Sequence, residues 1–310
     1  MILNILLIIV GVALVIWGAD RMTDGAVSIA KRLNIPQIII GLTIVAMGTS
    51  MPEFFVSLMS ALKGTSDLAV GNVVGSNIFN TLLIVGVTAL VTPIAISRST
   101  VKKDMPWSML AAVMLFILCY DRRISRLEAA LFAGVFVVFI FYTILEAKKG
   151  NVDPSTESKT YSPIKAIALV LLGLGCLVFG SNLFVDSATE VAQQLGVSDA
   201  VIGLTIVAGG TSMPELATSV VAARKGQSAI AIGNVIGSNV YNVLMIIGIT
   251  GLIHPMKIYD INIVDLGTMT MSMVLLWLFS FTKFKVERWE GAVLTGIFTA
   301  YMAWLLAEVI

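Results

Sequence analysis

The sequence predicts an all-α, polytopic membrane protein, and three observations lead to this fold class. Of the 310 residues, 57% are hydrophobic and only 13% are charged, whereas average soluble domains carry about 25% charged residues. Apolar runs of about 20 residues, the length that crosses the hydrocarbon core of a bilayer, recur along the whole chain. A stretch of forty residues also occurs twice. Together these features predict ten transmembrane helices in two inverted-topology five-helix repeats, with broken helices at the midplane.

The ten predicted spans are separated by charged residues or by breaks that contain Pro or Gly. The first repeat, 1–147, holds spans at 2–19, 36–62, 67–92, 104–120 and 125–146, and an oblique continuation of the first span to 32 stays open. The second repeat, 164–310, holds spans at 164–195, 198–223, 227–253, 262–281 and 288–308. Between them, residues 148–163 form a polar linker that is too short to fold alone. We therefore expect no soluble regulatory domain.

The distribution of Lys and Arg predicts the orientation in the cell membrane. If the N-terminus lies outside, fourteen basic residues fall on the cytoplasmic side and five on the outside, with Arg21 unassigned. The positive-inside rule then places both termini outside and the linker in the cytoplasm. The cluster of Arg122, Arg123 and Arg126 is the main observation against this orientation.

The composition also excludes several classes of function. A net charge of +1 gives no field that would attract nucleic acid. Cys119 and Cys176 lie far apart inside apolar runs, so they form neither a disulfide framework nor a metal site. The sequence has no HExxH motif and no nucleophile paired with a histidine, so we expect neither an enzyme nor a cofactor. We expect the protein to be embedded in the lipid bilayer, and the sequence indicates no obligate protein partner.

The internal repeat is the most informative feature of the sequence. Residues 41–80 align with 203–242 at a constant offset of 162, without a gap and with 25 identities in 40 positions. Each half holds an odd number of predicted spans, so the two halves enter the membrane from opposite sides. Inverted repeats of this kind place a substrate site near the midplane, where broken helices from the two halves meet.

Two repeated glutamates fall near the middle of predicted spans. An ionised Glu53 or Glu215 costs about 2.5 to 3.5 kcal/mol at the centre of a membrane helix. No Lys or Arg lies between Arg32 and Lys63, nor between Lys165 and Arg224. Neither carboxylate therefore has a basic partner in its own helix, and a mobile cation would offset the cost.

Other oxygen-bearing residues accompany each glutamate. Pro52 and Pro214 cannot donate a backbone hydrogen bond, so each frees carbonyl oxygens about one turn upstream. The neighbouring oxygen donors are the hydroxyls of Thr49, Ser50, Thr211 and Ser212 and the amides of Asn80 and Asn242. Calcium accepts six to eight oxygen ligands in flexible geometry. The absence of His and Cys from this set argues against zinc and copper, so the cage suits Na⁺ or Ca²⁺.

The repeated motifs resemble those of the sodium/calcium exchanger family, within the cation/calcium antiporter superfamily. Its two alpha repeats carry Gly-Thr-Ser-x-Pro-Glu and Gly-Ser-Asn-x-x-Asn/Asp, which match 48–53 and 210–215, and 75–80 and 237–242. The resemblance covers nearly the whole chain, in the prokaryotic ten-helix form. It implies a secondary antiporter that exchanges Na⁺ for Ca²⁺ by alternating access, with spans one and six sliding as a gate across the other eight.

The resemblance also implies four clustered ion sites between the repeats. It assigns Glu53 and Glu215 as shared anionic ligands, with Asn80 and Asn242 flanking the middle site. The implied remaining lining consists of Thr49, Ser50, Ser76, Thr211, Ser212 and Ser238 with the carbonyls of Ala46 and Ala208. Some relatives have Asp in place of Asn242, and in potassium-dependent members that Asp resembles a potassium determinant, so Asn242 argues against potassium cotransport.

Two central carboxylates have a consequence for charge movement, and two rival functions stay open. One Ca²⁺ would neutralise the pair, whereas three Na⁺ would leave one positive charge, so exchange on that count is electrogenic. The first rival is a Ca²⁺/H⁺ exchanger of the same superfamily, which usually carries Gly-Asn-x-x-Glu around the acidic residue and therefore ranks second. An ion channel built on duplicated helices ranks below it.

Overall fold

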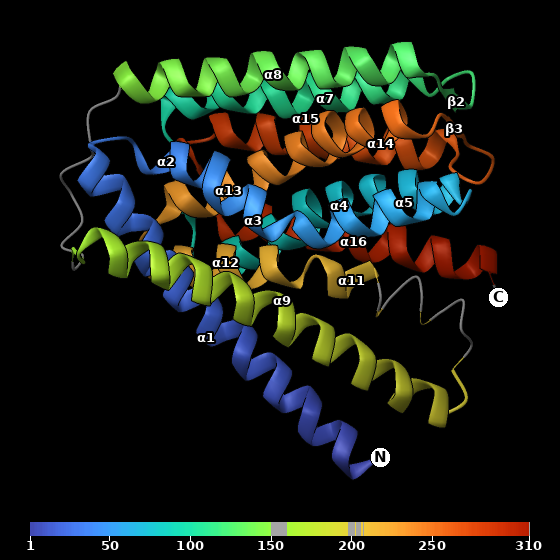
Figure 1. Ribbon diagram of the computed structural model, residues 1–310, viewed down its shortest axis with the longest axis horizontal. Helices are drawn as coiled ribbons and strands as arrows, with labels where there is room; N and C mark the ends of the chain where they lie inside the picture. The colour runs from blue at the N-terminus through green and yellow to red at the C-terminus, as the bar shows by residue number, and fades with distance from the viewer. Residues whose placement is uncertain (150–159, 198–201, 203–205, 207, 310) are drawn as a thin grey trace.

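The protein is a helical membrane protein with its long helices packed side by side (Figure 1). The computed structural model describes residues 1–149, 160–197, 202, 206 and 208–309. Seven described helices are long and apolar enough to cross a membrane, and the pair Gln37–Thr49 and Met51–Leu62, bent by 47°, makes an eighth. This confirms the predicted fold class. The count of ten stays a prediction, because the fourth predicted span holds a shorter helix and the seventh begins outside the described residues.

Two long helices lie aslant to the rest. Helices α1 (Ile2–Leu33) and α9 (Pro163–Gln194) have 32 residues each, which corresponds to about 48 Å at 1.5 Å per residue. The hydrocarbon core is only about 30 Å thick, so both helices must tilt. Figure 1 shows them running diagonally below the other helices. The first predicted span therefore does continue obliquely, and it ends where Asn34 adopts a left-handed conformation with φ of 54°.

Small residues let α1 and α9 pack along their whole length. Three glycines of α1, spaced seven residues apart, each face a small residue of the antiparallel α9. The pairs are Gly11 with Gly180, Gly18 with Gly173, and Gly25 with Ala166. A Cβ atom added at Gly18 would lie 2.7 Å from the carbonyl oxygen of Gly173. Such close approach of two backbones is the role of small residues in membrane helices, and it joins α1 and α9 into one unit.

The second predicted span is broken, as the sequence predicts. It consists of α2 (Gln37–Ile40), the π-helical segment η1 (Gly41–Val45), α3 (Ala46–Thr49) and, after a turn at Ser50, α4 (Met51–Leu62). In the second repeat, α11 (Ala208–Thr211) and α12 (Met213–Arg224) meet at Ser212. Each break falls just ahead of Pro52 or Pro214, in the first turn of the following helix, where a missing N–H is tolerated.

The third and eighth spans contain wide π-helical turns that the sequence does not reveal. The third consists of α5 (Ser66–Ile78), η2 (Phe79–Ile84) and α6 (Val85–Val91). The eighth consists of α13 (Ser228–Val240), η5 (Tyr241–Ile247) and α14 (Gly248–Ile253). Asn80 lies in η2 and Asn242 in η5. Single π-turns inside helices occur frequently at functional sites.

The remaining spans are joined by two short antiparallel ribbons that were not predicted. The helices are α7 (Met105–Leu118), which follows η3 (Thr100–Asp104), α8 (Arg126–Lys149), α15 (Ile263–Phe281) and α16 (Arg288–Val309). The ribbons pair β1 (Ile94–Ala95) with β4 (Lys285–Val286), and β2 (Arg123–Ile124) with β3 (Met256–Lys257). The offset of 162 relates β1 to β3 and β2 to β4, so the ribbons follow the internal repeat and tie one half to the other.

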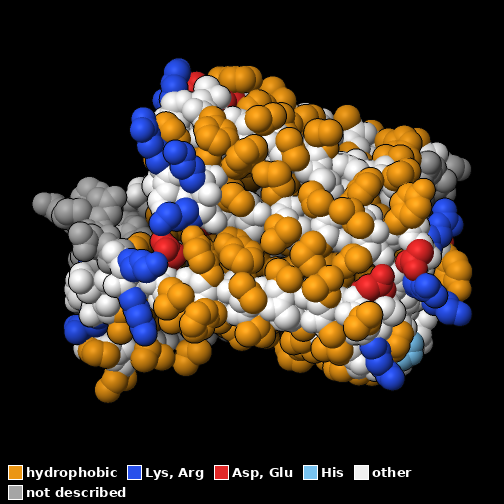
Figure 2. Space-filling view, turned by 90° about the horizontal axis from the view of Figure 1, so that it is seen from above, with side chains coloured by type: hydrophobic (Ala, Val, Ile, Leu, Met, Phe, Trp, Pro, Cys, Tyr) orange, Lys and Arg blue, Asp and Glu red, His pale blue; other side chains and the backbone are white. Residues whose placement is uncertain are grey.

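The surface has the polarity expected in a bilayer. Figure 2 shows hydrophobic side chains over the middle of one face and Lys and Arg side chains gathered at its two ends. Leu127 and Ile164 are more than 80% exposed, and apolar exposure on this scale marks a surface that contacts lipid. In the connection after β4, hydrogen bonds from Lys285 and Lys283 lower the pKa of Glu287 to about 2, as suits a charged cluster in water.

Candidate ion-binding site

The two broken helices bring both repeated glutamates into the centre of the molecule. Glu53 lies in the first turn of α4 and Glu215 in the first turn of α12, and each residue is only 1% exposed. The positive end of a helix dipole stabilises an anion at this position. The carboxylates are also close enough to repel each other electrostatically, so the arrangement concentrates negative charge between the repeats.

The serine at each break bonds the glutamate of the other repeat. Ser50 Oγ donates to Glu215 Oε1 over 3.1 Å, and Ser212 Oγ donates to Glu53 Oε1 over 3.2 Å. Both serines are fully buried. Each hydroxyl at a helix break therefore reaches the carboxylate of the other repeat.

Further predicted hydroxyls surround this pair. Ser238 Oγ donates to Glu215 Oε1 over 3.4 Å, while the hydroxyls of Ser212 and Ser76 lie 3.4 Å apart. The hydroxyls of Thr49 and Thr211 lie beside the carboxylates of Glu215 and Glu53, respectively. The structure thus brings together the six hydroxyl residues that the sequence assigns to the site.

Two asparagines hold the backbone of the glutamates in place. Asn72 Nδ2 donates to the Glu53 carbonyl over 3.1 Å and to Ser57 Oγ over 2.9 Å. At the positions offset by 162, Asn234 makes the corresponding bonds to Glu215 and Ser219, at 3.3 and 3.0 Å. The sequence analysis did not single out the two serines. Their identity at the repeat offset is the signal that could have found them.

The amides of the π-helical turns are also paired between the repeats. Asn80 Nδ2 donates to Asn239 Oδ1 over 3.2 Å, and Asn242 Nδ2 donates to Asn77 Oδ1 over 3.0 Å. These bonds use the nitrogen of Asn80 and of Asn242. The amide oxygen of each residue is left free of hydrogen bonds.

Four buried oxygen atoms in this region have no hydrogen-bond partner among the described residues. They are Glu53 Oε2, Glu215 Oε2, Asn80 Oδ1 and Asn242 Oδ1, two from each repeat. A buried acceptor left unsatisfied costs about 1 to 3 kcal/mol, and more when it is charged. Four such atoms on symmetry-related residues form a set of hard oxygen donors suited to a cation.

The predicted carbonyl ligands have other bonds in this conformation. The Ala46 carbonyl accepts from Ser50 N over 3.0 Å and from Thr49 Oγ1 over 3.3 Å. Ala208 lies in α11, and its side chain is outside the described set. The carbonyl of Gly210, one turn upstream of Pro214, accepts a hydrogen bond from Ser181 of α9. The carbonyl freed by the proline therefore links the broken helix to the α1/α9 unit.

A comparison with known protein families shows which family this chain belongs to. The family described as sodium/calcium exchanger protein matches the chain twice, over residues 3–145 and 165–307. The chain belongs to the sodium/calcium exchanger family. The two matches lie 162 residues apart, at the same offset that relates the motifs and the ribbons.

Individual relatives of this exchanger span nearly all of its length. CaxA of Alkalimonas amylolytica is named as a candidate antiporter. It is 39% identical to this chain, and the alignment covers 99% of this chain and 100% of CaxA. The sodium/calcium exchanger MaX1 of Methanosarcina acetivorans is 33% identical over 96% of this chain and 97% of its own. A solved structure of the sodium-calcium exchanger NCX_Mj aligns with a TM-score of 0.85 and 29% identity, over 98% of this chain and 99% of that one. The exchanger is thus a multi-pass membrane transporter, a cation/Ca²⁺ antiporter and not an enzyme.

Among the residues that the structure describes, no basic side chain takes the place of a cation at the glutamates of the exchanger. Within the described part of the chain, the ion pairs involve neither Glu53 nor Glu215. Across the same residues, no three His, Cys, Asp or Glu side chains gather in a group that could hold a metal ion. The neutral oxygens of hydroxyls and amides must therefore complete the coordination of any cation here.

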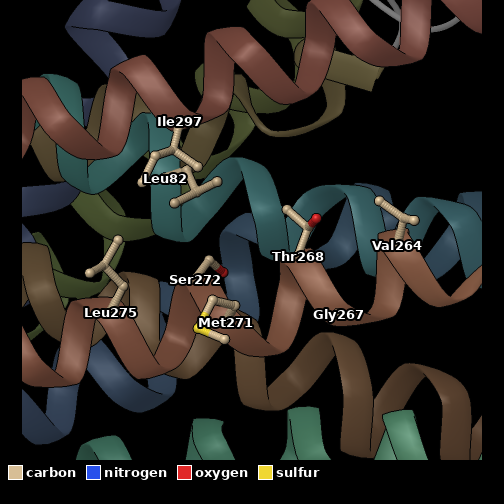
Figure 3. Close-up of a pocket in the computed structure, with 8 residues that line it drawn as sticks. All are labelled: Leu82, Val264, Gly267, Thr268, Met271, Ser272, Leu275 and Ile297. Carbon is tan, nitrogen blue, oxygen red and sulfur yellow. The ribbon is translucent and has the colours of Figure 1, made fainter.

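A hollow elsewhere in the exchanger has a different character. It has a volume of about 400 Å³ and is lined by Leu82, Val264, Gly267, Thr268, Met271, Ser272, Leu275 and Ile297 (Figure 3). Its lining lacks carboxylates, and the Ser272 hydroxyl donates to the Met269 carbonyl of its own helix. This mainly apolar hollow offers no anionic or amide ligand to Na⁺ or Ca²⁺, unlike the region around the two glutamates.

Proposed function

We propose that the protein exchanges Na⁺ for Ca²⁺ across the membrane by alternating access, with Glu53 and Glu215 as shared anionic ligands. The observation that carries this proposal is the set of four unpartnered buried oxygens, Glu53 Oε2, Glu215 Oε2, Asn80 Oδ1 and Asn242 Oδ1. A bound cation would satisfy all four, and the hydroxyls around them would add neutral ligands. The name of MaX1 as a sodium/calcium exchanger supports the choice of ions.

The charge of the site supports electrogenic exchange. Two ionised carboxylates are neutralised by one Ca²⁺, and three Na⁺ bound in its place leave one positive charge. Moving that charge across the membrane potential changes the energy by about 2.3 kcal/mol per 100 mV. Asn242 contributes no charge to this balance, which also argues against a further site for K⁺.

The unit formed by α1 and α9 is the proposed moving part. Glu53 and Glu215 are almost completely buried, so ions reach them only after a rearrangement. The helices α1 and α9 pack closely on each other through glycine and extend diagonally away from the remaining helices (Figure 1). Sliding of this unit past the broken helices would open the site first to one side and then to the other.

Calcium uptake by proteoliposomes tests the proposed exchange. Purified protein is reconstituted into vesicles loaded with Na⁺, which are diluted into Na⁺-free medium that contains radioactive Ca²⁺. We expect uptake that requires the Na⁺ gradient and that is lost in Glu53→Gln and in Glu215→Gln. Adding valinomycin and K⁺ to set the membrane potential should change the initial rate, because net charge moves.

Matched controls separate this function from its rivals. Glu128→Gln removes a carboxylate whose Oε2 accepts from Ser125 at the start of α8, away from the two broken helices, and should keep coupled uptake. Uptake driven by a proton gradient without Na⁺ would favour a Ca²⁺/H⁺ exchanger instead. Ca²⁺ flux without any counter-ion gradient would favour a channel, and coupled uptake retained in both Gln variants would contradict the proposed ligands.

A further inference from the structure

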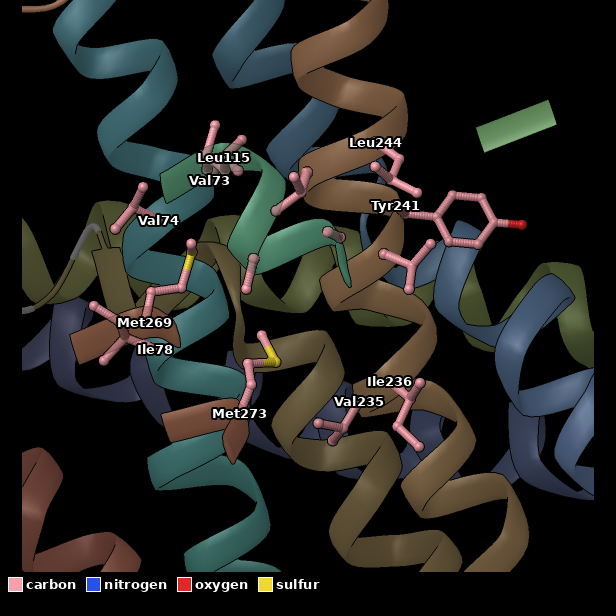
Figure 4. Packing of buried hydrophobic residues seen from close by; sticks show 14 of the residues in the cluster. Val73, Val74, Ile78, Leu115, Val235, Ile236, Tyr241, Leu244, Met269 and Met273 are labelled. Carbon is pink, nitrogen blue, oxygen red and sulfur yellow. The ribbon is translucent and has the colours of Figure 1, made fainter. Parts of the chain in front are cut away.

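A chain of hydrogen bonds runs from the ion site to a buried sulfur atom on α15. Asn80 Nδ2 donates to Asn239 Oδ1 over 3.2 Å, and Asn239 Nδ2 donates to Thr81 Oγ1 over 3.0 Å. Asn239 Nδ2 also lies 3.4 Å from Met273 Sδ, toward which the Thr81 hydroxyl points over 3.7 Å. All four residues are at most 3% exposed, and Figure 4 shows Met273 within the packed core.

The sulfur atom gives this chain a single direction. A thioether accepts hydrogen bonds but cannot donate one. The Thr81 hydroxyl therefore uses its proton toward Met273, and its lone pairs stay available for the amide nitrogen of Asn239. Asn239 then directs its oxygen at Asn80, and Asn80 directs its own oxygen away from this series of hydrogen bonds. Each donor in the relay points away from Asn80 Oδ1, the atom without a partner.

The opposite amide orientation would damage a cation site. If Asn239 turned over, its oxygen would face Met273, which has no proton to offer, and Thr81, whose hydroxyl would have to turn its proton away from the sulfur to donate to that oxygen. Asn80 would then turn as well and would direct its NH₂ group, in place of its oxygen, at the cation. The sulfur would then lose both of its donors, Asn239 Nδ2 and the Thr81 hydroxyl, so the acceptor-only sulfur disfavours this arrangement in the buried interior.

The second amide pair has an additional acceptor that makes its sulfur less important. Asn77 Nδ2 points to Met269 Sδ at 3.8 Å, but it also donates to the Asn239 backbone carbonyl at 3.4 Å. A backbone carbonyl also accepts only, so the orientation of Asn77 is set twice. Asn77 Oδ1 then accepts from Asn242. Met269 is therefore the natural control for Met273.

This relay breaks the internal symmetry of the protein. The offset of 162 relates Thr81 to Val243, and it relates Met273 to Ala111. Neither Val243 nor Ala111 can form a side-chain hydrogen bond. The repeat motifs alone therefore give no indication of the relay, and both sulfur atoms come from α15 of the second repeat.

We infer that Met273 is a positioning residue for ion binding, which acts through Thr81 and Asn239 to keep the amide oxygen of Asn80 directed at the cation. This inference rests on the proposed ion exchange, since it concerns the same site. It assigns to α15 a role in ion affinity although α15 contributes no ligand. Its expected signature is a change in the KM for Ca²⁺ at nearly constant protein stability.

Ca²⁺ uptake kinetics of conservative variants test this inference. Met273→Leu keeps the side-chain volume nearly constant and removes the acceptor, while Thr81→Val installs the residue found at the related position 243. We expect each to raise the KM for Ca²⁺ by about fivefold to tenfold, the equivalent of one lost buried hydrogen bond. The KM of Thr81→Ser and of Met269→Leu should stay within about twofold of the unaltered protein. Thr81→Ser keeps the hydroxyl between Asn239 and Met273, and Met269→Leu leaves Asn77 bonded to the Asn239 carbonyl.

The double variant Thr81→Val/Met273→Leu shows whether the two residues act through one relay. Its KM should equal that of the single variant with the higher KM, because the effects of neighbours in a single network are not additive. Equal KM values for Met273→Leu and the unaltered protein, or fully additive effects, would overturn the inference. Glu53→Gln, measured in parallel, keeps the two hypotheses apart. Retained exchange in that variant would contradict the proposed function, whereas its loss together with an unchanged KM in Met273→Leu would contradict the relay alone.

Discussion

Ser50 and Glu215 are joined across the two repeats by a hydrogen bond of 3.1 Å, from the serine hydroxyl to Oε1 of the carboxylate. The reciprocal bond from Ser212 to Glu53 is 3.2 Å long. Each glutamate is thus held in place by the break in the other repeat's helix. Neither half of the chain could form the site by itself, and any sliding of one half against the other would change both carboxylates together.

This relationship predicts equal effects of Ser50→Ala and Ser212→Ala. Each variant removes one hydrogen bond to a buried carboxylate, which is worth about 1.5 to 3 kcal/mol. We expect a decrease in the kcat/KM for Na⁺-driven Ca²⁺ uptake of about tenfold to a hundredfold in both. Ser108→Ala is the matched control, because that buried hydroxyl donates to the Met105 carbonyl of its own helix. Effects that differ widely between the two site variants would contradict the symmetric arrangement.

Much of the site could be predicted because duplication makes its signal unusually clear. A single glutamate inside an apolar run can be explained as a protonated, structural residue. That explanation fits poorly when Glu53 and Glu215 occur at one offset, each directly after a proline. The prolines also predicted that both helices are broken, and the structure places the breaks at Ser50 and Ser212. The sequence therefore indicated the fold class, the broken helices and the hydroxyls that meet between them.

Other features could not be read from the sequence because they depend on contacts between distant segments. The π-helical turns at Asn80 and Asn242 lie inside ordinary apolar runs, and residue preferences alone do not indicate one extra residue in a turn. The ribbon that pairs Arg123 with Lys257 links loops far apart in the chain. Met273 reaches Thr81 and Asn239 only because α15 packs against α5 and η2, and no motif marks it.

The close packing of α1 on α9 predicts a severe effect of Gly18→Leu. An added Cβ would lie 2.7 Å from the Gly173 carbonyl oxygen, so the helices must separate. Overpacking of this kind typically costs about 1 to 3 kcal/mol. We expect a lower thermal unfolding temperature and loss of most Ca²⁺ uptake. Gly175→Leu on α9 is the control, because a Cβ there would meet nothing within 4 Å. Unchanged stability in Gly18→Leu would contradict the described packing.

An ionic contact between α1 and α12 predicts a conformational effect of Lys225→Gln. The Lys225 ammonium lies 2.6 Å from a carboxylate oxygen of Asp20 and 2.6 Å from one of Asp24. All three side chains are about a third exposed, so we expect a contribution of only about 1 kcal/mol. Its loss should shift the balance between conformations about fivefold away from the one described here. Spin-label distances between α1 and α8 would measure the shift.

The internal repeat supplies the control for this contact. Lys63 stands at the position related to Lys225, and each is followed by a glycine with positive φ, Gly64 and Gly226. Among the ion pairs of the described residues, none involves Lys63. Lys63→Gln should therefore leave the spin-label distances unchanged. Raising the ionic strength should reproduce part of the Lys225→Gln effect by screening the contact, and equal responses of the two variants would argue against its role.

The charge of the site predicts which half of the transport cycle depends on voltage. On the proposed exchange at two carboxylates, the Ca²⁺-loaded site is neutral and a site loaded with three Na⁺ carries one positive charge. Asn242→Asp adds a third carboxylate, so the Na⁺-loaded site becomes neutral and the Ca²⁺-loaded site carries one negative charge. Membrane potential acts on the charged form with about 2.3 kcal/mol per 100 mV. The voltage dependence should therefore move from the Na⁺ step to the Ca²⁺ step.

Separate measurement of the two steps tests this prediction. In proteoliposomes at a set membrane potential, Na⁺/Na⁺ exchange should respond to voltage in the unaltered protein and Ca²⁺/Ca²⁺ exchange in Asn242→Asp. Asn80→Asp should behave in the same way, because Asn80 occupies the related position and its Oδ1 is unpartnered too. The total charge moved per complete cycle should not change, since the ions carried are the same. Voltage dependence that stays on the Na⁺ step in both variants would show that Asn80 and Asn242 lie outside the field of the bound ions.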